Sequence, residues 1–118
     1  MAGPENLQGI CVPPALVAEI PQVLASCGAK VEVVELSDAE RAAARLSVFR
    51  CISPMGFVVN VSLQRHRVAC GDGTLVIFYP QWKGRGGPGE EQFLANLVGV
   101  VRQRGAYEMA RQRRAKRT

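Results

Sequence analysis

Seven basic side chains crowd the last 17 residues of the chain, where only one acidic residue stands among them. They are Arg102, Arg104, Arg111, Arg113, Arg114, Lys116 and Arg117. This segment, which we call the arm, carries a net charge of +6, whereas the residues before it sum to −1. The overall charge of +5 therefore arises from the arm. Such an arm attracts polyanions through electrostatics that depend little on sequence. The pattern predicts contact with nucleic acid, RNA being favoured over DNA.

The end of this arm, Arg111 to Arg117, resembles the arginine-rich motifs of RNA-binding peptides, and equally a short nuclear-import signal. If the segment is helical, its bases encircle the rod, an arrangement that suits insertion into a groove walled by phosphates. Two other interpretations stay open. The arm can bind an acidic protein, or it can be a solvated tail that serves targeting or solubility.

A second group of candidate residues lies upstream. Arg65 and Arg67 flank a histidine between two expected strands, and Lys83 and Arg85 follow in a glycine-rich loop, so that the four bases could form one small basic patch. Trp82, beside that loop, could stack on a base, although a tryptophan in such a place more often plugs the edge of a core.

Residues with catalytic or metal-binding chemistry are present but lack the spacing that such chemistry needs. The lone histidine, His66, has no nucleophile or carboxylate at a spacing that would orient it as a general base. The four cysteines form no C-x-x-C pair, and we expect them to be small buried hydrophobic residues, not bridges or zinc ligands. The glycine-rich stretch 84–89 lacks the P-loop pattern. The sequence therefore predicts no enzyme, cofactor or metal.

The remaining sequence must form the body that holds the arm. A chain of 118 residues that is 47% hydrophobic suits one packed domain. We expect a single domain over residues 1–101, including most of the last helix, and a basic helical extension or tail over 102–118. A strand at 7–12 precedes a helix at 14–27 that Pro21 must kink or divide. A strand at 30–36 and a helix from Ser37, which begins a capping box with Glu40, to about Leu46 follow.

The second half of the body is β-type. Runs at 48–52, 57–63, 68–70 and 75–79 alternate between turn residues and predict an antiparallel meander, with the run 75–79 apolar on both faces and therefore central. A helix then starts near Glu90 and packs through a stripe of apolar side chains. The predicted fold class is α+β: a mainly antiparallel sheet of about five to six strands, two N-terminal helices and a long C-terminal helix ending in the basic arm.

These patterns favour a non-catalytic nucleic-acid-binding protein or ribonucleoprotein subunit. The alternative is a small assembly or adaptor protein that binds other proteins, or a second copy of itself, through the sheet or the last helix of its body. The chain shows neither a secretory signal nor a membrane-spanning run, so we expect an intracellular protein of the cytoplasm or nucleus.

Overall fold

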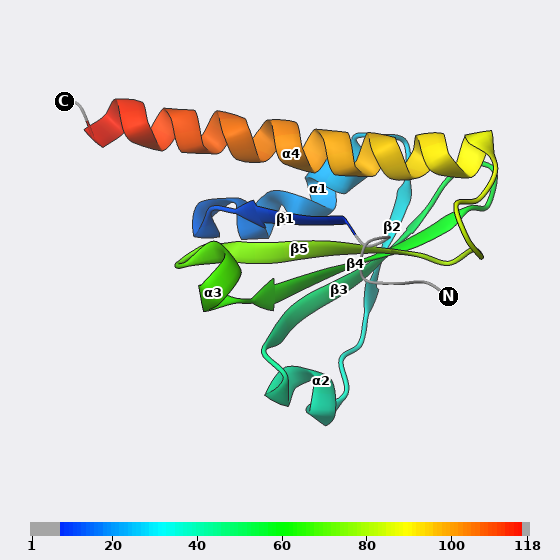
Figure 1. Cartoon of the computed structure of the whole chain (residues 1–118), viewed down its shortest axis with the longest axis horizontal. Coiled ribbons are helices and arrows are strands. Elements are labelled where there is room, and N and C mark those ends of the chain that lie inside the picture. The colour runs from blue at the N-terminus through cyan, green and yellow to red at the C-terminus, as the bar shows by residue number, and fades with distance from the viewer. Residues whose placement is uncertain (1–7, 117–118) are drawn as a thin grey trace.

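Five antiparallel strands form one sheet in the order β1-β5-β4-β3-β2. The computed structural model describes residues 8–116, and Figure 1 shows how the helices are set against this sheet. The strands are β1 (Gln8–Val12), β2 (Lys30–Val34), β3 (Arg45–Ile52), β4 (Val58–Arg65) and β5 (Thr74–Pro80). With the long C-terminal helix, this sheet confirms a single α+β domain.

Five helical segments complete the fold. They are the 3-10 helix η2 (Pro14–Glu19), α1 (Ile20–Ala25), α2 (Asp38–Ala42), α3 (Arg67–Cys70) and α4 (Pro88–Lys116). The first two meet at Ile20, as expected from Pro21, which lacks a backbone donor and stands where α1 needs none. The capping box of α2 is present: Ser37 Oγ accepts from the Glu40 amide at 3.2 Å, and Glu40 Oε1 accepts from the Ser37 amide at 3.1 Å.

The core lies between one face of the sheet and the helices η2, α1 and α4 (Figure 1). Alternate residues of β4 face it, because side chains alternate across a strand. Val59, Val61 and Leu63 are buried as expected, and Leu97 and Val101 of α4 also belong to this core. The long helix therefore docks through the apolar stripe that the sequence contains.

The opposite face of the sheet lies outside the main core cluster, although Val48 and Ser62 on it are buried. Leu75, Ile77 and Tyr79 of β5 lie on this face and are only partly buried, next to Asn60 of β4. β5 is an inner strand, because it pairs with β1 on one side and with β4 on the other, but its second apolar set is only partly buried, so the expected cover on both faces is not found. The central strand is β4, and β5 lies between β4 and the edge strand β1.

Two local expectations are also corrected. The run 68–70 is not a strand, because residues 67–70 form the short helix α3 within the β4–β5 connection, leaving five strands. The second helix stops at Ala42 instead of continuing to about Leu46. Ala44 adopts a positive φ of 66° just beyond it, a left-handed conformation that ends the helix and turns the chain into β3.

Candidate nucleic-acid interface

The basic arm is the outer part of α4, whose helical structure continues to Lys116 (Figure 1). Its attachment to the body extends further than the expected boundary at Arg102. Gly105 is buried, and a Cβ built there would lie 3.6 Å from Val12 Cγ1, so the helix passes close over the end of β1. Glu108, one turn later, is only 2% exposed. Glu108 is therefore the last buried residue of the helix within the described chain.

Two arm arginines are bound to acidic side chains of the same molecule. Arg104 Nη2 donates to Glu19 Oε1 at 2.8 Å, and its guanidinium lies 5.2 Å from the centre of the Tyr107 ring. Arg111 Nη2 donates to Glu108 Oε1 at 2.9 Å. This hydrogen bond, followed by the charge of Glu108, raises the pKa of the Arg111 guanidinium. Neither arginine is fully available to a phosphate.

The other arm cations of the described chain are exposed. Arg102, Arg113, Arg114 and Lys116 form no ion pair within residues 8–116, and Arg117 lies outside the described residues. At about 100° per residue, Arg113 and Arg114 fall on the side of α4 opposite the buried Leu97 and Val101. The helix therefore projects these charges away from the body.

The expected second patch does not form, because β5 separates its members. Arg65 ends β4 and Arg67 begins α3, both at the end of the sheet where β5 starts, whereas Lys83 and Arg85 follow the other end of β5 (Figure 1). Figure 1 also shows that α3 and the C-terminal end of α4 lie at the same end of the molecule. Arg85 further lies 3.8 Å from Glu91.

Trp82 is held by the edge of the core. Its ring packs edge-on against Phe57, with centroids 6.5 Å apart, and a Cβ at Gly86 would collide with the indole. The partly buried ring touches the main core cluster. This packing favours the plug over the stacking platform.

The cysteines differ from expectation. Cys11, at the end of β1, and Cys70, in α3, form a disulfide across 59 residues of sequence, so the prediction of four unbridged cysteines was wrong for this pair. The other two are free. Burial, followed by the nearby Cys27, raises the pKa of the Cys51 thiol to about 12, and burial also raises that of Cys27. Cys51 belongs to the core, and the partly buried Cys27 packs against it.

Sequence reasoning also missed a cavity of about 360 Å³ beside α3. It is lined by Arg65, His66 and Arg67, the triplet that is contiguous in the sequence, together with residues of η2 and β3. The sequence shows that two arginines flank a histidine. It does not show that residues from distant segments line the same cavity.

The described residues hold no group of three or more His, Cys, Asp or Glu side chains placed to bind a metal ion. None of their helices is long and apolar enough to cross a membrane. No known family model matches the chain, and neither curated proteins nor solved structures gave a significant match.

Proposed function

We propose that this protein is a non-catalytic nucleic-acid-binding protein, or a ribonucleoprotein subunit, that contacts phosphates with the outer part of α4, and that RNA is preferred over DNA. The observation that carries the proposal is the exposed set Arg113, Arg114 and Lys116 on a helix that continues beyond the body. Arginine and lysine in this setting release counterions from a polyanion when they bind it.

Because α4 is helical to Lys116, the arm can bind nucleic acid as a preformed helix. A helix can lie along a groove with its charged side exposed, and its inner part is already fixed by packing around Leu97 and Val101. Binding then orders only side chains, which costs less conformational entropy than folding a whole segment.

The test measures the affinity of the full chain for a labelled single-stranded RNA and for a DNA duplex of equal length, over a series of salt concentrations. Replacing Arg113, Arg114 and Lys116 by glutamine should weaken binding to both. Three lost phosphate contacts should flatten the slope of log K against log salt by about 2 for the single strand.

The matched control removes three charges elsewhere, by Lys30→Gln, Arg41→Gln and Arg50→Gln, at exposed positions of β2, α2 and β3. Net charge falls by the same amount, but the slope should change much less. If both triple variants lose the same affinity, binding reflects overall charge, and the arm is not the interface.

One observation favours the alternative, an assembly or adaptor protein. The open face of the sheet presents Leu75, Ile77 and Tyr79 partly exposed, next to Asn60 Oδ1, which is buried without a hydrogen-bond partner in the described chain. A protein partner or a second copy could cover this face. Light scattering on the purified chain would reveal such a dimer, and Ile77→Asp should dissociate it.

The proposed location is the cytoplasm or nucleus. Thiol pools in these compartments reduce most disulfides, so the Cys11–Cys70 bond gives this part of the proposal a direct test. Rapid alkylation of thiols in intact cells, followed by mass spectrometry, should find both cysteines modified. Recovery of a fully bridged protein would place it in an oxidising compartment instead.

A further inference from the structure

A cavity of about 360 Å³ opens at the end of the sheet where α3 lies. Its apolar wall is formed by Pro14 and Val17 of η2 and by Leu46 of β3. Its polar wall comes from the end of β4 and the start of α3, at residues 65–67, and from the turn after α3, at residues 71–74. The volume is within the usual range for small-molecule sites, and such sites combine an apolar surface with a few polar groups.

The charge in this cavity is predominantly positive. Arg65 and Arg67 both line it, and neither forms an ion pair within the described chain. Asp72 is the only acidic residue in the lining, and it too has no ion pair there. Two unmatched guanidinium groups against one carboxylate favour an anionic ligand, because each guanidinium presents a planar fork of donors that fits phosphate oxygens.

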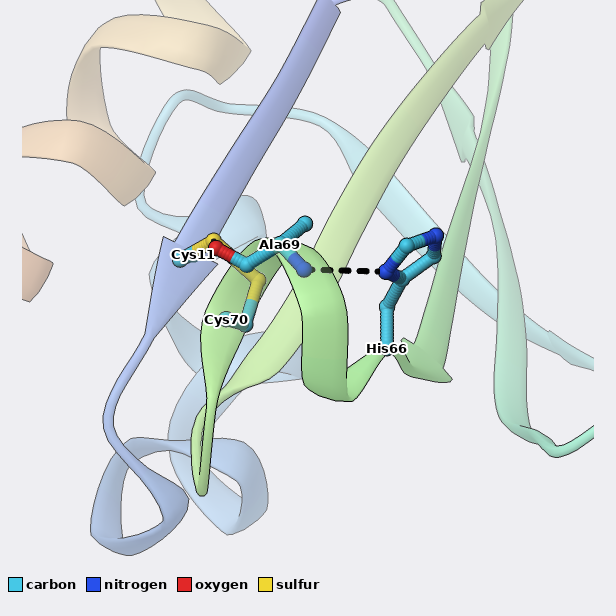
Figure 2. The surroundings of a disulfide bond; sticks show 4 residues. All are labelled: Cys11, His66, Ala69 and Cys70. Carbon is cyan, nitrogen blue, oxygen red and sulfur yellow. Dashed lines mark hydrogen bonds between the residues drawn. A yellow bond between two sulfur atoms is a disulfide. The ribbon is translucent and has the colours of Figure 1, made fainter.

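His66 adds a further donor to the same cavity. Its Nδ1 accepts a hydrogen bond from the Ala69 amide at 3.1 Å, and Figure 2 shows the other ring nitrogen turned away from that amide. Because Nδ1 acts as acceptor, the proton of the neutral ring lies on Nε2. That N–H group is left available to an anion.

The turn that carries these groups is fixed in place. The Cys11–Cys70 disulfide ties α3 to β1, as Figure 2 shows, and the Cys11 sulfur also lies 3.4 Å from the Ala69 carbonyl oxygen. Gly73 passes so close to β1 that a Cβ would stand 2.8 Å from the Val12 carbonyl oxygen. The Gly73 contact holds this turn whether or not the disulfide is reduced, and a site held in this way loses little entropy when it binds.

We propose that this cavity binds a phosphate monoester that carries an apolar or aromatic group, the chemistry of a nucleoside monophosphate. Arg65, Arg67 and the His66 Nε2–H group hold the phosphate, and the flat group lies against Pro14, Val17 and Leu46. The shared chemistry has two sources, a free nucleotide and the 5′-phosphorylated end of a strand. The proposal does not depend on the arm, whose cations belong to a different segment.

The experiment titrates the full chain with a nucleoside 5′-monophosphate, followed by calorimetry and by phosphorus NMR, with inorganic phosphate in a parallel titration. The nucleotide should bind more tightly than phosphate alone, and Leu46→Ser should reduce that difference. Arg65→Gln combined with Arg67→Gln should weaken nucleotide binding about tenfold or more. The matched control, Arg113→Gln with Arg114→Gln, removes the same charge from the arm and should leave it within about twofold.

Two strands of equal sequence, one with a 5′-phosphate and one with a 5′-hydroxyl group, separate the two sources. Tighter binding of the phosphorylated strand that is lost in the Arg65/Arg67 variant identifies a strand end as the ligand, whereas equal binding of both strands identifies the free nucleotide. Absence of nucleotide binding, or equal losses in the two double variants, overturns the proposal. Neither result affects the salt-dependent binding expected of the arm, so the two proposals fail separately.

Discussion

The inner and outer parts of α4 belong to one helix but hold their charges in opposite ways. The inner part, from Phe93 to Glu108, is docked on the core. Its Arg104 pairs with Glu19, and its Glu108 pairs with Arg111 at the start of the outer part. The outer part, from Met109 to Lys116, has no buried residue, and its last three cations have no acidic neighbour in the described chain. Whether a basic side chain can bind a partner therefore depends on whether an acidic side chain of the same molecule lies close enough to pair with it. The number of basic residues alone does not show this.

The largest expected effect concerns the disulfide at β1, the edge strand that the inner part of α4 contacts. Replacing both Cys11 and Cys70 by serine removes a bond that closes a loop of 59 residues. In the chain-entropy model this lowers the free energy of unfolding by about 4 kcal/mol. Urea denaturation measures the loss, and the variant should no longer respond to reductant. Equal stability of the wild-type protein with and without reductant would show that the bond contributes nothing.

A smaller loss is expected from the packing of the inner part itself. Leu97 is fully buried on the core-facing side of α4, and Leu97→Ala leaves a cavity that the neighbouring side chains fill only in part. The free energy of unfolding should fall by about 3 kcal/mol. Thermal or urea unfolding followed by circular dichroism measures it.

The matched change in the outer part is Arg114→Ala, which should shift stability by less than about 0.5 kcal/mol, since that side chain is exposed. Comparable losses in the two variants would mean that the outer part is packed as well, and the comparison between the two parts would fail.

Much of this architecture could be predicted from local signals. Pro21 divides the first helix, Ser37 and Glu40 form the capping box, and the alternation in β4 assigns its core face. Local signals fail where chain segments far apart meet. The sequence could not reveal that Glu19 would reach Arg104 across 85 residues, because that pairing requires α1 and α4 to be packed side by side.

The same limit applies to the disulfide and to the cavity. Cys11 and Cys70 meet only because β1 pairs with β5 and α3 folds back onto that edge. The sequence places Arg65 and Arg67 together but does not show that η2 and the start of β3 enclose them. The candidate residues could be identified from the sequence, but which of them lie close together depends on how the strands and helices are arranged.

Glu108 lies at the boundary between the two parts of α4. Its partner Arg111 is the last arm cation of the described chain that has an acidic neighbour. Glu108→Gln keeps the shape of the side chain but weakens its charge-assisted hydrogen bond to Arg111. The free energy of unfolding should fall by about 1 kcal/mol. Arg111 becomes available at the same time, so affinity for single-stranded RNA should rise and the salt slope should steepen by about 0.7.

A loss of stability with a gain in binding is a combination that a merely damaged protein would not show. Glu19→Gln is the matched control, since it releases Arg104, which stays beside Tyr107 and the body. Its effect on RNA affinity should be smaller. Weaker binding by the Glu108 variant would contradict the assignment of the outer part as the interface.

The smallest effects are expected from substitutions that change helix propensity. In the inner part such a change should alter the free energy of unfolding, and in the outer part it should not. Gly99 is exposed in the inner part, and a Cβ added there would meet no atom within 4 Å, so Gly99→Ala should raise the free energy of unfolding by about 1 kcal/mol at most. Gln112→Gly in the exposed outer part costs a similar amount locally. That cost does not reach the global transition, because an undocked helix end can unwind while the core stays folded.

Urea denaturation should therefore detect the first change and miss the second, whereas hydrogen exchange should show faster exchange of the amides from Met109 to Lys116 in the second alone. A lower global stability of Gln112→Gly would show that unwinding of the outer part is coupled to the core, and that the arm contributes to the cohesion of the body.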